Sequence, residues 1–311
     1  MGFDEIIDRR GTCSVKWDAM EALYGVPADD GISMWVADMD FRPPQCISNA
    51  VAKMHEHGVY GYYGDDAPYR EAICWWMKTR HGWDVDPAGI FTTHGLVNGT
   101  AMCVDAFTNP GEGVVLFTPV YHAFAKVISA AGRDVVECEM SNVNGRYELD
   151  FDAYDAQMTG NETMLVLCSP HNPSGRVWSK GELQAVAAFA KRHELILVSD
   201  EIHHDLVFEG NEHIPMANIA GIEDRLVMMT ATTKTFNIAG SHSGNVIIAD
   251  PDLRARFGAR MMAMGASMAP VTSRAKLSSG PTTPLTGCRS TQPSERIFCS
   301  RPMQYWKRTF S

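Results

Sequence analysis

The chain has 311 residues, 45% of them hydrophobic, which is enough for one large domain and a smaller one. Its formal net charge of −10 argues against nucleic acid or an anionic membrane surface as the main partner. The eight cysteines are scattered, no apolar run could span a bilayer, and the N-terminal stretch has no signal-peptide core. We therefore expect a cytoplasmic protein with reduced thiols rather than a disulfide framework.

Short apolar runs alternate with helical stretches from residue 90 to residue 250. Helical spacing predicts helices over 123–132 and 179–194, and Ser179 with Glu182 makes a capping-box pattern at the start of the second. Runs this apolar, joined by helices, predict an α/β fold with a mostly parallel central sheet covered by helices. The expected strands cover residues 90–93, 113–121, 134–140, 164–170, 195–202, 225–232 and 244–250.

Polar residues lie at the ends of three successive strands. Asn172 follows the first, Asp200 and His203 lie at the end of the second, and Lys234 follows the third. Because ligands bind beyond the carboxyl ends of parallel strands, these side chains are candidates for one site. Singly, each has an ordinary explanation, such as an Asn-Pro turn, a helix cap or a solvated cation. A metal is not expected, because no H-E-x-x-H spacing occurs.

Taken together, these residues fit the needs of pyridoxal 5′-phosphate (PLP). A lysine that forms a Schiff base with PLP needs an acid beside the pyridine nitrogen, because the protonated ring accepts electrons. Lys234 can be that amine and Asp200 that acid, while Asn172 and His203 can donate to the phenolic oxygen of the ring. The sequence therefore favours PLP as the cofactor.

A phosphate cradle is expected where the strand at 90–93 leads through Gly95 into a helix. The free amides of Gly95, Leu96 and Val97 would meet the phosphate at the N-terminus of that helix. Tyr121 offers an aromatic ring to stack on the cofactor. No G-x-G-x-x-G or G-x-x-x-x-G-K-[ST] motif occurs, which counts against dinucleotide and P-loop sites.

Several motifs between about residue 3 and residue 268 carry a family resemblance. The chain resembles a fold-type I PLP enzyme of the class I/II aminotransferase superfamily, and above all its MalY/PatB-type cystathionine β-lyase branch. The motifs are MWVADMDF, YGYYG, TPVYHAF, SPHNPSGRVW, SDEIHHDLVF and TKTFNIAG.

The resemblance implies a role for each residue around the cofactor ring. Lys234 is the Schiff-base lysine, and Asp200 pairs with the pyridine nitrogen. Asn172 contacts the phenolic oxygen, and His203 stands where many aminotransferases have a tyrosine with the same task. Tyr121 stacks on the ring.

Further roles implied by the resemblance concern the phosphate. The hydroxyls of Thr232 and Thr233 would bind it. His242 occupies the position, eight residues after the lysine, where many superfamily members grip the phosphate with an arginine, and it is a weaker, pH-dependent cation. Tyr62 resembles the catalytic-site tyrosine that reaches the phosphate of the neighbouring subunit, which implies a homodimer.

The substrate side of the site is expected in the N-terminal segment. Ala37 and Asp38, together with Asn172, would lie beside a small amino-acid substrate. Residues 1–45 would form the N-terminal segment of the small domain with this substrate loop, and residues 46–255 the PLP-binding large domain. Residues 256–268 would start an interdomain helix.

Residues 269–311 differ sharply from the rest of the chain. They carry seven basic residues and one acidic residue, and they lack any sustained helical or strand period. They do not resemble the small C-terminal domain that supplies the carboxylate-binding arginine in the family. We therefore expect an aberrant or disordered tail from a frameshifted or truncated product, so that the small C-terminal domain is missing.

The leading hypothesis is α,β-elimination from an L-amino acid with a β-thioether, such as L-cystathionine. Lys234 would take the Cα proton as general base, and a thiol, pyruvate and ammonia would be the products. An aminotransferase that uses the same residues is one alternative. A truncated, non-catalytic or regulatory protein that keeps the PLP fold is the other.

Overall fold

The computed structural model describes residues 4–62 and 64–265. Its main sheet contains β1 (Ile90–Thr93), β2 (Gly113–Thr118), β3 (Asp134–Glu139), β6 (Glu162–Cys168), β7 (Ile196–Asp200), β8 (Leu226–Thr230) and β9 (Gly244–Ile248). The strand order is β1-β9-β8-β7-β6-β2-β3. The strands from β8 to β3 run parallel, whereas β9 is antiparallel to both of its neighbours. The mostly parallel sheet expected from the sequence is confirmed.

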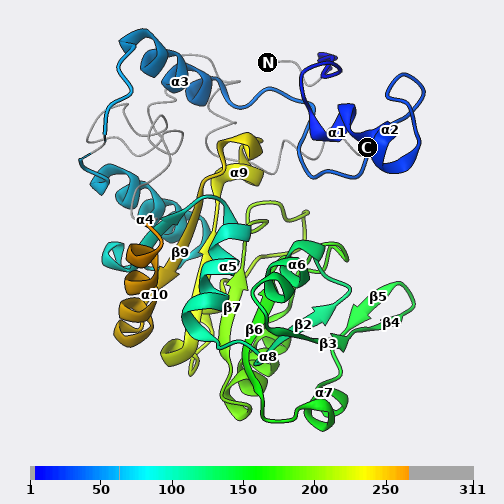
Figure 1. The fold of residues 1–311 in the computed structure, drawn as a ribbon, viewed down its shortest axis with the longest axis vertical. Coiled ribbons are helices and arrows are strands. Elements are labelled where there is room, and N and C mark those ends of the chain that lie inside the picture. The colour runs from blue at the N-terminus through cyan, green and yellow to red at the C-terminus, as the bar shows by residue number, and fades with distance from the viewer. Residues whose placement is uncertain (1–3, 63, 266–311) are drawn as a thin grey trace.

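Helices cover both faces of this sheet (Figure 1). α4, α7 and α8 share one hydrophobic core with the sheet, and α5, α6 and α10 share the other. The helices are α1 (Val15–Asp18), α2 (Met20–Tyr24), α3 (Gln45–His57), α4 (Ala67–His81), α5 (Leu96–Phe107), α6 (His122–Ala130), α7 (Phe151–Gln157), α8 (Lys180–Arg192), α9 (Thr232–Thr235) and α10 (Pro251–Ala263). A separate hairpin consists of β4 (Ser141–Val143) and β5 (Arg146–Glu148).

Alternate side chains of each central strand enter the two cores. In β2, Val114 and Leu116 pack with α5 and α6, whereas Val115 and Phe117 pack with α7 and α8. All four are at most 1% exposed. Since successive strand residues point to opposite faces, a strand buried on both sides must be apolar throughout. This explains why these strands appear in the sequence as continuous apolar runs.

The helices expected between the strands also form. Ser179 caps α8: its hydroxyl accepts from the Glu182 amide, and the Glu182 carboxylate accepts from the Ser179 amide at 2.8 Å. The capping box predicted from these two residues is therefore confirmed. The helix expected over 123–132 is observed as α6.

The N-terminal segment lies beyond the end of the sheet at which α9 is found (Figure 1). Ion pairs hold the loop that the sequence predicts to face the substrate: Arg9 contacts Asp38 at 2.7 Å and Asp40 at 2.8 Å, and Lys16 contacts Asp40 at 2.7 Å. Lys16 also donates to the Asp38 carbonyl at 2.9 Å. The loop is thus tied to α1 and to the segment before it.

The expected division into domains remains a prediction. The boundary placed at 255/256 falls inside α10, whose Leu253 and Phe257 are buried in the core shared with α5. The tail expected over 269–311 lies outside the described residues. Within the described part of the chain, no helix combines the length and the apolarity that a membrane span requires.

Candidate active site

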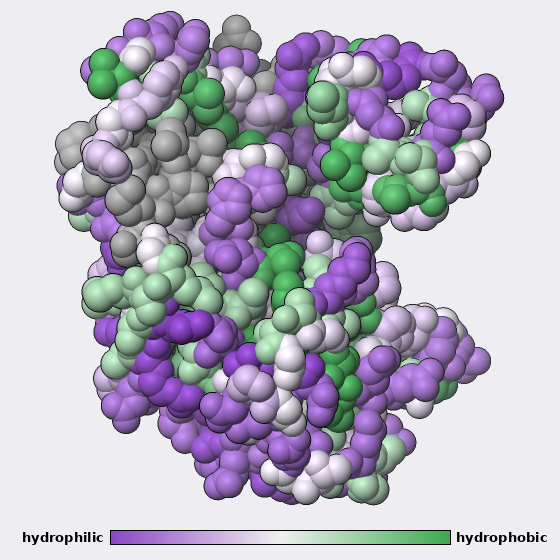
Figure 2. All heavy atoms as spheres, in the orientation of Figure 1, coloured by the Kyte–Doolittle hydropathy of each residue, from purple (hydrophilic) through white to green (hydrophobic). Residues whose placement is uncertain are grey.

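Lys234 lies in α9, the short turn that follows β8. Its ammonium donates to the Ala37 carbonyl at 2.8 Å, which places the N-terminal loop directly over the lysine. Burial lowers the pKa of Lys234, and the nearby carboxylates of Asp38 and Asp200 oppose that effect. The opening between the N-terminal segment and the body of the molecule is visible as a hollow in Figure 2.

Asp200 ends β7 and pairs with Met229 of β8, so its carboxylate and Lys234 belong to adjacent strand ends. One carboxylate oxygen accepts from the Ile202 amide at 3.1 Å, and within the described residues the other has no hydrogen-bond donor. Burial raises the pKa of Asp200 to about 7; Glu201 adds to this effect and Lys234 opposes it. A buried carboxyl with a free oxygen is suited to a cationic N–H partner.

His203 and Asn172 approach the same edge from the turns after β7 and β6. Burial lowers the pKa of His203 to about 4, and the positive charge of Lys234 adds to that effect. The imidazole is therefore neutral at physiological pH. The Asn172 amide N–H donates to Cys168 Sγ at 3.3 Å, while its side-chain amide makes no hydrogen bond within the described residues.

The expected cradle is the N-terminus of α5. Gly95 is its N-cap with φ of +80°, and a Cβ added there would meet only open space. The Leu96 side chain is buried beneath the turn, whereas Val97 is 37% exposed. Because the first amides of a helix have no partner within the helix, those at this open turn are free to bind an anion.

The start of β9 supports this cradle through close backbone contact. A Cβ on Gly244 would lie 2.9 Å from the Gly95 carbonyl carbon and 3.1 Å from the Leu96 nitrogen. Only glycine therefore lets β9 pass directly beneath the turn. The contact links the position of the cradle to the central sheet.

Tyr121 caps α6 and is half-buried, with its ring edge-on to Phe124 at 5.6 Å between centroids. Burial raises the pKa of Tyr121, and the Asp200 carboxylate contributes to the increase. The phenol therefore lies within the electrostatic field of the buried acid. Tyr121 follows β2, which runs parallel to β6 and β7, so it lies at the same edge of the sheet as Asp200.

The remaining expected phosphate ligands are spread around the turn after β8. Thr233 is buried and Thr232 half-buried within α9. His242 is exposed, and its ring stacks on that of His94 with centroids 4.8 Å apart and an interplanar angle of 5°. Tyr62 is 92% exposed, so the described chain does not itself bring this tyrosine to Lys234.

Asn237 is a structural part of the site that the sequence did not single out. Its side-chain oxygen accepts from the Met39 amide at 2.8 Å, and its side-chain nitrogen donates to the Met39 and Phe41 carbonyls at 2.7 and 2.6 Å. These bonds fasten the loop of residues 37–41 to the turn that carries Lys234. The only available signal was the proximity of Asn237 to the lysine in the TKTFNIAG motif.

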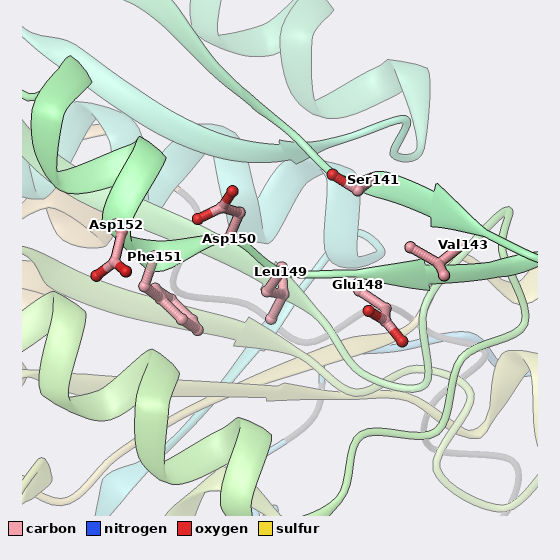
Figure 3. A pocket seen from close by; sticks show the side chains of 7 residues that line it. All are labelled: Ser141, Val143, Glu148, Leu149, Asp150, Phe151 and Asp152. Carbon is pink, nitrogen blue, oxygen red and sulfur yellow. The ribbon is translucent and has the colours of Figure 1, made fainter.

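A separate hollow of about 430 Å³ lies between the β4–β5 hairpin and the start of α7 (Figure 3). Glu148, Asp150 and Asp152 give it an acidic lining. Asp150 caps α7 by accepting from the Ala153 amide. None of its lining residues belongs to the candidate site, and Asp150 has a structural role as the cap of α7.

Comparison with known proteins agrees with this geometry. The family model for aminotransferase class I and II matches residues 30–281. The chain belongs to this family. It is 40% identical over 267 residues to cystathionine beta-lyase PatB of Bacillus subtilis, covering 85% of this chain and 68% of PatB. It is 32% identical over 239 residues to protein MalY of Escherichia coli, covering 76% of this chain and 60% of MalY.

Solved structures of family members have the same fold. Cystalysin from Treponema denticola, which contains PLP, is 36% identical with a TM-score of 0.82; the match covers 88% of this chain and 70% of cystalysin. The PLP-bound C–S lyase from Staphylococcus hominis is 30% identical with a TM-score of 0.82, covering 89% of this chain and 69% of the lyase. The fold-type I large domain expected from the sequence is thereby confirmed.

The Asn237 clamp predicts a specific change in backbone protection. In Asn237→Ala the Met39 amide loses its acceptor, so its hydrogen exchange should become about tenfold faster. Exchange resolved to single amides measures this. Asn98→Ala is the matched control, because Asn98 accepts from the His94 amide and should affect that amide alone. Unchanged exchange at Met39 in Asn237→Ala would contradict the clamp.

The buried Asp200 predicts a pH-dependent stability. A carboxyl whose pKa is raised in the folded state stabilises fully below its unfolded value, near 3.8, and loses that contribution as pH rises through about 7. Asp200→Asn should therefore gain stability relative to wild type by up to roughly 3 kcal/mol between pH 5 and pH 8.

Urea unfolding of the chain without added PLP, at both pH values, measures this difference. Tyr121→Phe is the control: it removes a neighbouring phenol whose pKa is raised above 10.0, so the difference from wild type should stay constant over this range. If the difference in unfolding free energy between Asp200→Asn and wild type is equal at pH 5 and pH 8, the pKa of Asp200 is not raised in the folded chain.

Proposed function

We propose that this chain is a PLP-dependent C–S β-lyase that cleaves L-cystathionine or a related L-cysteine S-conjugate. For L-cystathionine, the substrate and one water yield L-homocysteine, pyruvate and ammonia. The observation that carries the proposal is the placement of buried Asp200 and partly desolvated Lys234 at the ends of adjacent parallel strands.

The surroundings of the Asp200 carboxylate fit the pyridine nitrogen of PLP. The carboxylate is buried and has one oxygen without a donor within the described residues, so a protonated pyridine nitrogen would satisfy it. When bound, PLP supplies an aldehyde that takes up an amine and a ring that accepts electrons. Asp200 would hold the proton on the ring nitrogen, and the neutral His203 would face the phenolic oxygen together with Asn172.

The phosphate of PLP would bind at the open N-terminus of α5. Gly95, Leu96 and Val97 present amides there, supported by the close passage of Gly244. Thr232, Thr233 and His242 would complete the site on the side of the turn after β8, and Tyr121 would cover the ring. These assignments combine the geometry of the turn with the family motifs.

Lys234 would move the proton at the substrate Cα. Burial lowers its pKa, which increases the fraction of neutral amine able to accept a proton. The amine must first leave the Ala37 carbonyl, its hydrogen-bond acceptor in this structure. Ala37, Asp38 and Asn172 would then contact the substrate beside the lysine.

The lyase reading is favoured over the aminotransferase reading by the nature of the relatives. PatB is a cystathionine beta-lyase, and the Staphylococcus hominis structure is a C–S lyase. An aminotransferase is the second candidate, because the chain is 33% identical over 175 residues to a Mycobacterium tuberculosis protein named "Probable N-succinyldiaminopimelate aminotransferase DapC". The fate of the substrate distinguishes the two reactions.

The proposed assembly is a cytoplasmic homodimer in which Tyr62 reaches the site of the partner. Most of the large apolar side chains exposed in the described residues lie between Ile6 and Tyr62. Ile6, Ile32 and Met34 are 96%, 84% and 82% exposed. Such a concentration of apolar surface is typical of an interface.

The first prediction of this proposal concerns cofactor attachment. Adding PLP to the purified chain should give a yellow absorption band, and borohydride treatment should fix the cofactor to the peptide containing Lys234. Lys234→Ala should lose both signals, whereas the exposed Lys53→Ala should keep them. Attachment to another lysine, or none, would contradict the assignment.

The second prediction concerns the products. L-Cystathionine should release pyruvate in the absence of any 2-oxo acid, as measured with a lactate dehydrogenase-coupled assay. Lys234→Ala should lower the rate by at least about 100-fold, because the general base is removed. An absolute requirement for a 2-oxo acid would assign the chain to the aminotransferases instead.

A further inference from the structure

A buried carboxylate, Asp205, lies just outside the candidate site and accepts hydrogen bonds from several directions. Its side chain is 2% exposed. His81 contacts it at 2.9 Å and His204 at 3.1 Å. Trp76 donates its indole N–H at 3.0 Å, and the Thr235 hydroxyl donates at 2.8 Å.

These contacts join three separate parts of the chain. Trp76 and His81 belong to α4, and His204 belongs to the same turn as Asp205, after β7. Thr235 is the residue directly after Lys234 and the last residue of α9. Asp205 therefore bridges the turn that carries Asp200 and the turn that carries Lys234.

The charges within the cluster are balanced. Burial alone would raise the pKa of Asp205, but His204 and His81 hold it well below its ordinary value. Burial would likewise lower the pKa of His204, but the Asp205 carboxylate raises it. Burial lowers the pKa of His81. The cluster is thus an Asp205–His204 ion pair with a neutral His81 beside it.

Hydrogen bonding accounts for this arrangement better than a metal ion does. Ligand-type atoms of His81, His204 and Asp205 lie within 4.8 Å of one another. However, the hydroxyl of Thr235 and the indole N–H of Trp76 already donate to the carboxylate, and an indole N–H can only donate. His204 Nδ1 also contacts the Glu201 carbonyl.

The turn that carries Lys234 depends on such external support. α9 spans only Thr232–Thr235 and has no side-chain cap at its N-terminus. A single helical turn is not stable alone. Two contacts hold its C-terminal end. The Thr235 hydroxyl donates to Asp205, which is itself bonded to Trp76 and His81 of α4. Phe236 packs edge-on against Trp76 at 5.3 Å between centroids.

We propose that Asp205 is a positioning residue that sets the place of Lys234 relative to Asp200 by holding the Thr235 hydroxyl. Its side chain is 2% exposed and bonded to the Thr235 hydroxyl, so it acts through α9. The inference rests on the proposed function, because it assigns a reason for placing Lys234 beside Asp200. Loss of the Thr235 hydroxyl should let the turn move and expose the Lys234 amine to water.

The test compares Thr235→Val, which removes the hydroxyl at nearly constant shape, with Thr235→Ser, which keeps it. Thr100→Val is the matched control, because Thr100 is a fully buried threonine whose hydroxyl donates to the Leu96 carbonyl instead. In the full chain without added PLP, mass spectrometry follows reductive methylation of Lys234 as a function of pH.

We expect the midpoint of the Lys234 labelling profile to move upward in Thr235→Val, towards that of an exposed lysine, because the amine becomes better solvated. Thr235→Ser and Thr100→Val should keep the wild-type midpoint. An unchanged midpoint in folded Thr235→Val would overturn the proposal. Thr100→Val controls for the loss of a buried hydroxyl in general. Its unfolding temperature should fall as that of Thr235→Val does, while the midpoint of its Lys234 labelling profile stays at the wild-type value.

If Thr235→Val does not fold, Trp76→Phe replaces it. This change removes one donor from Asp205 but keeps an aromatic ring for Phe236, and it must move the midpoint in the same direction. An unmoved midpoint in folded Trp76→Phe would also overturn the proposal.

A second measurement separates this inference from the proposed function. With PLP added, cofactor incorporation should be about tenfold slower in Thr235→Val than in wild type and Thr235→Ser. If wild type incorporates no PLP at Lys234, the proposed function fails, while the labelling profile still decides the role of Asp205. If wild type incorporates PLP and Thr235→Val does so at the same rate, the positioning role is contradicted.

Discussion

The register between β7 and β8 is the constraint on which the site depends. Asp200 pairs with Met229, so an acid at the end of one parallel strand and a lysine just beyond the next meet at one edge of the sheet. Both strands are buried on two faces and cannot shift register without moving their whole apolar sets into the wrong core. The candidate site is therefore positioned by hydrophobic packing at a distance from Asp200 and Lys234 themselves.

The sequence was sufficient for a mostly parallel sheet covered by helices, whereas its assignment of the site residues stays a prediction. Continuous apolar runs and the capping box at Ser179 are local signals. The mostly parallel direction of the strands follows from the alternation of such runs with helices. The reversal of β9 was not predictable, because an apolar strand of five residues carries no mark of its direction. Asn237 and Asp205 were missed for a related reason: their partners lie on distant segments, so spacing gave no indication of them.

Burial favours the neutral form of three ionisable groups of the site. It raises the pKa of Asp200 and lowers the pKa values of Lys234 and His203, and in each case the neutral form gains. Asp205 stays ionised because His204 lies beside it and several donors share its charge. Two aspartates five residues apart therefore have different charge states, which the amino-acid type alone would not reveal.

The antiparallel direction of β9 has a consequence for how tolerant this region is to change. Because β8 ends and β9 begins at the same edge of the sheet, the chain between them turns back without crossing to the other end. That single connection carries Lys234, Thr235, Asn237 and His242. Inserting or deleting one residue there would displace the Lys234 amine, the Thr235 bond to Asp205 and the Asn237 bonds to the loop of residues 37–41 together. Outside these four residues, the connection should accordingly accept substitutions more readily than changes in length.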